Sequence, residues 1–439
     1  MGWSRALAAL TVGFLMAGCA GIAPIRGTPR AHQPARQADA ASSRVEHVVI
    51  IVQENRSFDN FFATFPGADG TSVGQLHTGV TIPLRKGDLV MPYDLAHSFH
   101  GYEVAYNGGK MNGFDLEAGG GGTGPAGTYP YLYVDPKQIA PYWTLAKRYV
   151  LADHFFSTQG SDSFTAHQDV IAGGTQIDPS QSLIDLPSPG GRPWGCDAPK
   201  GTVTSLITLD NRYLFDRGPF PCLAYPTLAA LLNRKHVSWK YYTPSFSQPG
   251  GQIWNAFDAI KAIRYSQQWK TNVSRPDTNV FVDIGRGRLP AVSWVIPEPH
   301  YSDHPHAPVD DGPSWVASIV NAIGSSSYWN STVIVIVWDE WGGLYDHVPP
   351  PQMGFGGLGM RIPAIVVSPY ARRGYVSHTQ YEFGSILKFV ENVWGLGRLG
   401  TTDVRANSIG DTLDFKQPPQ KFVPVAALHS KEFFLRGAR

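Results

Sequence analysis

This 439-residue sequence contains few cysteines and has almost no net charge. It holds 3 cysteines, and its 36 Lys and Arg residues are balanced by 35 Asp and Glu residues. This balance excludes a global basic field of the kind that attracts nucleic acid or an anionic membrane surface. Because of this charge balance, we expect no nucleic-acid partner. The cysteine spacing matches no C-x-x-C motif, which argues against a thiolate metal site.

Internal repeats and a phosphate-binding P-loop are also absent. The glycine tract at 119–122 has neither the preceding strand nor the following Lys-Ser/Thr pair that a P-loop requires, so we interpret it as a surface loop. In contrast, 47 glycines and 35 prolines predict long ordered loops, and 43 % hydrophobic residues are enough for a large core. Function is expected in such loops, carried by a rigid scaffold.

The first 19 residues resemble a bacterial lipoprotein signal peptide. One positive charge precedes an apolar run at 6–16 that is too short to span a bilayer, and small residues stand before Cys19. Cys19 would then be acylated and attach the protein to a membrane. Met16 stands where such signals usually carry Leu, which leaves ordinary signal cleavage as the alternative. We expect an exported protein, in the bacterial periplasm or on the outer membrane as a lipoprotein, with secretion as the alternative.

The domain organisation is predicted from composition. Residues 20–44 are polar and contain proline, which predicts a flexible linker. Residues 45–439 are expected to form a single domain with a loop-rich insertion at about 178–226. Cys196 and Cys222 lie in that insertion, and in an oxidising compartment we expect them to form a disulfide. It would close a loop of about 26 residues and stabilise the protein by about 3 kcal/mol.

Two aliphatic segments end in polar residues. Residues 47–52 and 332–338 are the patterns of strands buried on both faces, and Glu54-Asn55 and Asp339-Glu340 come after them. Open α/β sheets place ligands and catalysts at such strand ends. If the two strands are parallel neighbours, three carboxylates and one amide share a small volume, which is costly unless a cation neutralises them. The alternative is that each polar group belongs to an ordinary loop.

Strands and helical stretches alternate along the rest of the chain. Further strands are expected at 237–242, 291–296 and 364–367, and helices at 227–234, 314–323 and 385–394. This alternation predicts the α/β class, with a mostly parallel central sheet and helices on both faces.

Ser163 is the candidate nucleophile. Residues 155–173 have the pattern of a loop feeding a short helix that Gly173 closes. A hydroxyl at the start of such a helix faces unpaired backbone N–H groups and the positive end of the helix dipole, which suits attack on a phosphorus atom. The alternative is an ordinary N-cap serine. A metal at the two strand ends would favour the first interpretation, because coordination activates an alcohol without a histidine base.

Five segments together resemble a known family: residues 47–60, 97–114, 163–173, 304–305 and 338–351. The sequence is similar to the bacterial phosphoesterase family that contains non-haemolytic-type phospholipases C and a respiratory-burst-inhibiting acid phosphatase. That family is related to the alkaline phosphatase superfamily, which implies an alkaline-phosphatase-like sheet sandwiched by helices. Glu-Asn-Arg-Ser-Phe-Asp at 54–59 and the Gly-Gly-x-Tyr-Asp-His-Val-Pro-Pro-Pro pattern at 342–351 carry most of the resemblance.

The resemblance implies roles for individual residues. It makes Glu54, Asn55, Asp339 and Glu340 the metal ligands and Ser163 the nucleophile.

His97 and His304 match histidines that contact the phosphate or protonate the leaving group. His347 is expected to hold Asp339 or Glu340 in position without binding the cation itself. We expect four other histidines to be structural: His154, His167, His236 and His306.

One divalent cation is the expected cofactor. The implied ligands are oxygen donors without thiolate or imidazole, a set that hard cations prefer. Calcium, magnesium or manganese is therefore favoured over zinc.

The expected function is metal-dependent hydrolysis of a phosphoric ester through a phosphoserine intermediate. Ser163-Phe164-Thr165-Ala166 replaces the Thr-Pro-Asn-Arg that is usual in the phospholipase C branch, which favours a phosphomonoesterase like the acid phosphatases. A further departure is Asp162, which stands where proline is common before the Ser-Phe pair, and whose charge could repel a phosphate. The alternatives are a phospholipase C acting on phosphatidylcholine-type lipids and, in another class, a non-catalytic, surface-anchored binding protein on an esterase scaffold.

Overall fold

The computed structural model describes residues 43–119, 124–190, 192–307 and 309–437. The expected signal peptide with Cys19, and nearly all of the expected linker, lie outside the described residues. Among the described residues, none of the helices has both the length and the apolar character needed to cross a membrane.

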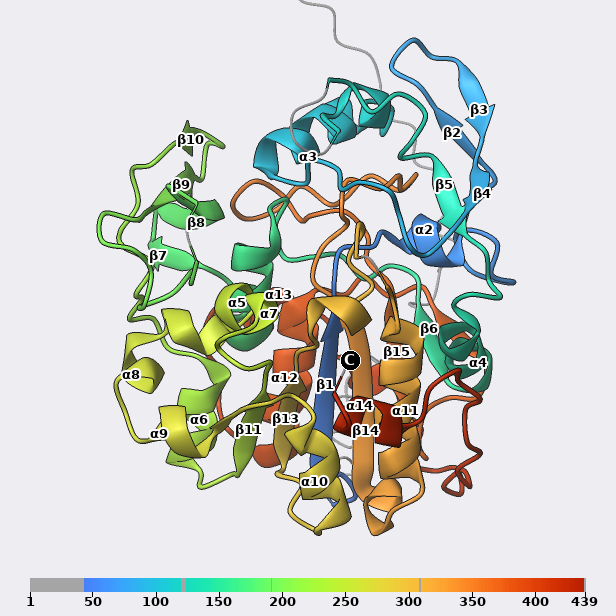
Figure 1. The fold of residues 1–439 in the computed structure, drawn as a ribbon, viewed down its shortest axis with the longest axis vertical. Helices are drawn as coiled ribbons and strands as arrows, with labels where there is room; N and C mark the ends of the chain where they lie inside the picture. The colour runs from blue at the N-terminus through green and yellow to red at the C-terminus, as the bar shows by residue number, and fades with distance from the viewer. Residues whose placement is uncertain (1–42, 120–123, 191, 308, 438–439) are drawn as a thin grey trace, which may run out of the picture.

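An eight-stranded sheet lies at the centre of the protein (Figure 1). In spatial order its strands are β12 (Val273–Ser274), β11 (Trp239–Tyr242), β13 (Val292–Val295), β1 (His47–Gln53), β14 (Thr332–Trp338), β15 (Ala364–Val367), β6 (Val150–Ala152) and β16 (Tyr375–Ser377). Only β15 among them runs antiparallel to its neighbours. The predicted α/β class with a mostly parallel sheet is confirmed.

Helices pack around this sheet in two groups. One group consists of α4 (Ala140–Arg148), α10 (Asn279–Gly285), α11 (Gly312–Gly324) and α14 (Lys431–Leu435). The other consists of α5 (Ser163–Ala172), α6 (Leu228–Arg234), α12 (Phe383–Trp394) and α13 (Thr402–Arg405). β14 is buried at every position and β1 at all but its first, so the sheet is covered on both faces at its centre.

A second sheet lies largely within the segment that was expected to be loop-rich, and a long loop joins two of its strands. It is antiparallel, with the order β10 (Tyr213–Leu214), β9 (Val203–Thr208), β8 (Gln181–Ser188) and β7 (Gln176–Asp178). Figure 1 shows this sheet above α5, on the opposite side of the molecule from the strand pairs formed by β2 (Val73–Gln75) with β3 (Thr81–Pro83) and β4 (Arg85–Gly87) with β5 (Leu132–Val134). The carboxyl end of β1 points upward between these two parts.

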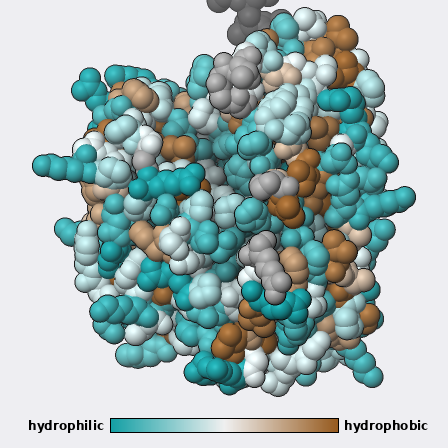
Figure 2. Space-filling model, in the orientation of Figure 1, coloured by the Kyte–Doolittle hydropathy of each residue, from teal (hydrophilic) through white to brown (hydrophobic). Residues whose placement is uncertain are grey.

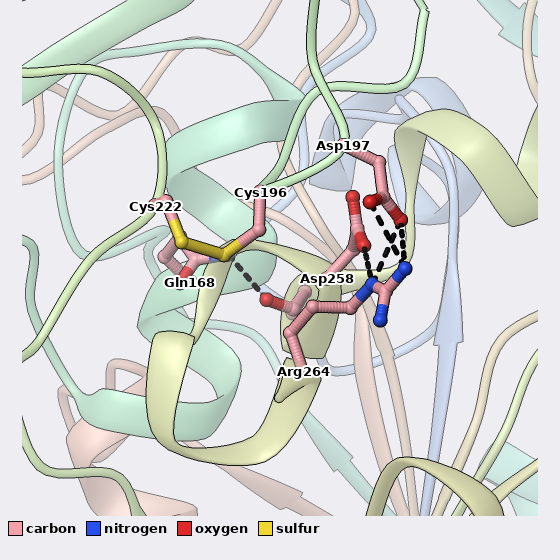
Figure 3. The surroundings of a disulfide bond; sticks show 7 residues. Gln168, Cys196, Asp197, Cys222, Asp258 and Arg264 are labelled. Atoms are coloured by element: carbon pink, nitrogen blue, oxygen red, sulfur yellow. Dashed lines mark hydrogen bonds and ion pairs between the residues drawn. A yellow bond between two sulfur atoms is a disulfide. The ribbon is translucent and has the colours of Figure 1, made fainter. Parts of the chain in front are cut away.

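The expected disulfide between Cys196 and Cys222 is present (Figure 3). Beside it, Arg264 binds Asp197 at 2.7 Å and 2.9 Å and lies 3.3 Å from Asp258. The backbone N–H of Cys196 donates to the Asp258 carbonyl at 2.8 Å. Figure 3 shows Gln168 of α5 next to the bridge, so the disulfide lies beside the helix that begins with Ser163.

Removing the disulfide is expected to destabilise the fold. The bridge joins residues 26 positions apart, and a loop of that length contributes about 3 kcal/mol by restricting the unfolded chain. The Cys196→Ser/Cys222→Ser variant should therefore unfold at lower urea concentration and with a somewhat steeper transition, because its unfolded chain is less compact. An unchanged midpoint would contradict this expectation. Wild-type protein treated with a reductant serves as the control, because it should match the variant.

Candidate active site

The ends of β1 and β14 form one edge of the sheet. The two strands are parallel neighbours in which Gln53 pairs with Trp338, so the next residues of both leave the sheet together. These next residues are Glu54, Asn55, Asp339 and Glu340, and each is 0 % exposed. The polar residues after the two aliphatic segments therefore lie together at one sheet edge, as expected, and do not belong to separate loops.

Asn55 lies at the centre of this edge. Its φ of 52° is in the left-handed region, which asparagine tolerates better than most residues. This conformation directs its backbone N–H to Asp339 Oδ1 at 2.8 Å. Its side-chain Nδ2 contacts Glu340 Oε1 and lies 3.3 Å from His97 Nε2 and 3.5 Å from Ser163 Oγ. One amide thus joins an acidic residue, a histidine and the candidate nucleophile.

Ser163 is the first residue of α5, and Asp162 rather than Ser163 is the N-cap. The Asp162 side chain makes no capping bond and instead accepts the backbone N–H of Leu186 at 2.8 Å. Burial, with Asp185 nearby, raises the pKa of Asp162 well above its usual value, so its carboxyl is biased toward the neutral form. The repulsion of phosphate expected from a charged Asp162 is weakened accordingly.

The carboxyl groups at the sheet edge disfavour one another's charge. Burial, and then the nearby Asp339, raises the pKa of Glu54 well above its usual value, and the same two causes raise the pKa of Glu340. Among the four residues at this edge, three buried oxygens lack a hydrogen-bond partner in the described part of the chain: Glu54 Oε2, Asn55 Oδ1 and Asp339 Oδ2. Unpaired oxygens and repelling carboxylates are the two features that a bound cation would relieve, so these residues fit a metal.

His167 is a part of this edge that the sequence interpretation missed. Its Nε2 lies 2.8 Å from Glu54 Oε1 and 3.9 Å from Asp339 Oδ2. Burial lowers the pKa of His167 to about 4, against the opposing charge of Asp339, so the imidazole is neutral near pH 7. One signal was available: His167 comes four residues after Ser163, which places both side chains on one face of the helix.

His97 and His304 face each other across Asp94. His97 Nδ1 lies 3.8 Å from Asp94 Oδ1, and His304 Nε2 lies 3.9 Å from Asp94 Oδ2. Both rings donate Nδ1–H to a backbone carbonyl, of Leu95 at 2.7 Å and of Pro305 at 2.5 Å. A neutral ring in that tautomer has an unprotonated Nε2, which fits the bond that His97 Nε2 accepts from Asn55.

His347 does not contact the residues that the sequence analysis expected it to orient. It was expected to orient Asp339 or Glu340, but its Nδ1 lies 2.7 Å from Asp59 Oδ2 and its backbone N–H donates to the same oxygen at 2.9 Å. The physical reason is the turn after the second acidic pair, where Gly342 has a φ of 66°. A Cβ at this glycine would lie 2.4 Å from the Asn55 carbonyl, so only glycine lets the chain pass this closely.

The group around Asp59 is held by an arginine. The Arg361 side chain is 0 % exposed, and its Nε lies 2.8 Å from Asp346 Oδ1 while its Nη2 lies 3.4 Å from Asp59 Oδ1. These carboxylates therefore already have a cationic partner, in contrast to the unpaired oxygens at the ends of β1 and β14.

Two curated proteins with the name phospholipase C are similar to most of this chain. Phospholipase C A from Mycobacterium tuberculosis (strain CDC 1551 / Oshkosh) is 25 % identical over 447 residues, covering 87 % of this chain and 79 % of that protein. Non-hemolytic phospholipase C from Burkholderia pseudomallei (strain K96243) is 25 % identical, covering 86 % of this chain and 60 % of that protein.

Solved structures resemble the chain only remotely. A protein in the alkaline phosphatase superfamily from Vibrio parahaemolyticus has a TM-score of 0.36 at 12 % identity, covering 86 % of this chain and 79 % of that one. A 2-O GAG sulfatase has a TM-score of 0.40 at 9 % identity, covering 85 % and 76 %. Similarity this low assigns no role to any residue. The model of the Phosphoesterase family, however, matches residues 45–397, and the chain belongs to this family of hydrolases that act on phosphoric ester bonds.

Proposed function

We propose that the protein is a metal-dependent phosphoric-ester hydrolase in which Ser163 attacks phosphorus and forms a phosphoserine intermediate. The observation that carries this proposal is the position of Asn55 Nδ2, which contacts Glu340 Oε1 and lies 3.5 Å from Ser163 Oγ. A phosphoryl group held at this amide would lie next to both the acidic edge and the hydroxyl.

Glu54, Asn55, Asp339 and Glu340 are the residues proposed to hold one divalent cation. The three unpaired oxygens of Glu54, Asn55 and Asp339 support this assignment. When bound, the cation would lower the pKa of the Ser163 hydroxyl and offset charge on the phosphoryl oxygens.

The protein's own groups then have distinct tasks. Ser163 Oγ forms a bond to phosphorus as the ester P–O bond breaks, and the proton of the hydroxyl passes to solvent. His97 and Asn55 hold the phosphoryl oxygens as charge shifts onto them. His304 in its protonated form, with Nε2 3.9 Å from the Asp94 carboxylate, delivers the Nε2 proton to the departing alkoxide and regains a proton from the water that attacks next. Water then attacks the phosphoserine, the P–Oγ bond breaks, and phosphate leaves as the serine hydroxyl is restored.

A phosphomonoester is the substrate class that we place first. The segment that begins with Ser163 lacks the Thr-Pro-Asn-Arg sequence typical of the phospholipase C branch. On the face shown in Figure 2, hydrophobic residues lie in separate small groups rather than in one broad patch that would suit a lipid surface. The names of the relatives favour the second candidate, a phospholipase C acting on phosphatidylcholine-type lipids. Family membership sets aside the non-catalytic binding protein.

Export from the cytosol is part of the proposal. The disulfide between Cys196 and Cys222 supports an oxidising compartment such as the bacterial periplasm, since such bonds are rare in the cytosol. Attachment to a membrane through acylated Cys19 rests on the sequence pattern alone. Mass spectrometry of the protein from its native host would distinguish acylation from ordinary signal cleavage.

Two chromogenic substrates test the proposed function. We expect hydrolysis of p-nitrophenyl phosphate that a chelator abolishes and that a divalent cation restores. We expect p-nitrophenyl phosphorylcholine to be hydrolysed at least about tenfold less efficiently in kcat/KM. A phosphomonoester has three non-bridging oxygens and this diester has only two, so one contact made by a site built for the monoester is lost. The reverse preference would favour the phospholipase C candidate. Activity unaffected by the chelator would contradict the metal-dependent mechanism.

A further inference from the structure

We propose that His167 is an additional ligand of the cation, so that the site has a mixed oxygen and nitrogen ligand set. The inference rests on the proposed cation site and revises the expected cofactor. A site with an imidazole ligand favours a first-row transition cation such as Mn²⁺, Fe²⁺ or Zn²⁺ over Ca²⁺ and Mg²⁺, which prefer oxygen alone.

The first support is the geometry of three side chains. Glu54, His167 and Asp339 each offer a ligand atom within 4.8 Å of the others, and all three are buried. His167 Nε2 lies 2.8 Å from Glu54 Oε1 and 3.9 Å from Asp339 Oδ2. Metal–ligand bonds of about 2.1 Å place neighbouring ligand atoms about 3 to 3.5 Å apart, so the observed separations bracket those around a small cation.

The second support is the unpaired atoms beside the ring. Glu54 Oε2 and Asp339 Oδ2 are buried and have no hydrogen-bond partner among the described residues. Each belongs to a carboxylate that His167 Nε2 approaches. An unpaired oxygen on both carboxylates, next to a ring nitrogen, is an arrangement that a shared cation would satisfy.

The third support is how the ring is held. Trp254 stacks on His167 with ring centroids 6.4 Å apart and planes inclined by 21°. His167 also lies one helical turn after Ser163 in α5. The same helix would therefore bring both an imidazole ligand and the nucleophile to the cation, with the ring plane fixed by an indole. With a cation bound, the ring proton would reside on Nδ1 and Nε2 would be the ligand atom.

His97 is the competing imidazole at this edge. Its Nε2 lies 4.0 Å from Glu340 Oε1, but that nitrogen already accepts a bond from Asn55 Nδ2 at 3.3 Å. His97 is also partly exposed, with 17 % of its side-chain surface accessible, compared with 2 % for His167. The buried ring next to the unpaired oxygens is the better ligand of the two, because ligand exchange with water is restricted there.

Pulsed electron paramagnetic resonance of Mn²⁺ distinguishes these two histidines without measuring activity. The full chain is stripped of metal and loaded with one equivalent of Mn²⁺, and nitrogen hyperfine coupling is recorded. We expect the wild type and His97→Gln to show coupling to a directly bound imidazole, and His167→Gln to lose it. Glutamine suits a helix interior, and circular dichroism checks that the variant is folded. Loss of coupling in His97→Gln with its retention in His167→Gln would overturn the inference.

Cation selectivity provides a second measurement. Competition calorimetry should show that the wild type binds Mn²⁺ more tightly than Ca²⁺, and that His167→Gln reduces this preference at least about tenfold, while His97→Gln leaves it within about threefold. If the wild type binds Mn²⁺ but shows no nitrogen coupling, His167 is not a ligand, and the proposed metal-dependent function still stands. A wild-type protein that binds no divalent cation would refute the proposed metal-dependent function as well. If His167→Gln does not fold, the wild type and His97→Gln still decide the question through the first measurement.

Discussion

Ser163→Ala should lower the rate of phosphate-ester hydrolysis by at least about a thousandfold, because it removes the atom that forms the bond to phosphorus. The fold should survive, since the only side-chain hydrogen bond at Ser163 Oγ that the described residues show is a 3.5 Å contact from Asn55 Nδ2. The steady-state rate with p-nitrophenyl phosphate measures the loss. Acid quenching followed by mass spectrometry of the peptide with Ser163 should detect the phosphoserine in the wild type only.

Ser161→Ala is the matched control for this substitution. Ser161 is also buried and lies two residues before Ser163, in the loop that leads into α5, but its Oγ accepts the backbone N–H of Asp185 at 2.9 Å. Its loss should cost about 1 kcal/mol of stability and leave turnover within about tenfold of the wild type. A Ser163→Ala variant as active as this control would show that the covalent step does not involve Ser163.

Asp339→Asn should remove both cation binding and activity, again by about a thousandfold in rate. Asp339 Oδ1 accepts the backbone N–H groups of Asn55 and Glu340, each at 2.8 Å, and an asparagine carbonyl preserves both bonds. The substitution therefore changes only the charge and the unpaired Oδ2. Metal content after gel filtration, and the rate as a function of added cation, measure the effect.

The control for charge removal is Asp346→Asn. Asp346 is as buried as Asp339, but its Oδ1 accepts from Arg361 Nε at 2.8 Å, so its charge is matched by an arginine. Its substitution should destabilise the fold by about 3 kcal/mol, because it leaves a buried guanidinium underpaired, and should not change the affinity for the cation. Equal loss of cation binding in both variants would mean that the acidic edge is not the metal site.

Local sequence predicted the scaffold closely where hydrophobic patterns are strong. The strand expected at 332–338 matches β14, and the strand expected at 364–367 matches β15. Both are aliphatic runs that only a covered sheet can bury. The antiparallel direction of β15 and the second sheet at β7–β10 could not be predicted from any such pattern. Strand direction depends on the path of the connecting chain, which local hydrophobicity does not encode.

For the candidate site, too, sequence could predict some residues and not others. Glu54, Asn55, Asp339 and Glu340 could be assigned to one sheet edge from sequence, because a buried parallel strand delivers the residues after its carboxyl end to that edge. The positions of His167 and His347 could not be predicted in this way: His167 contacts Glu54, and His347 contacts Asp59 rather than Asp339 or Glu340.

The sequence by itself determined the strand ends, the acidic residues that come after them and the family to which the chain belongs. Only the tertiary structure decided which histidine reaches those acids. A helix that begins at Ser163 carries His167 inward, whereas the turn at Gly342 carries His347 to Asp59. The physical reason is that a strand end is defined by local burial, whereas a contact between distant side chains depends on the packing of the helices and turns that carry them.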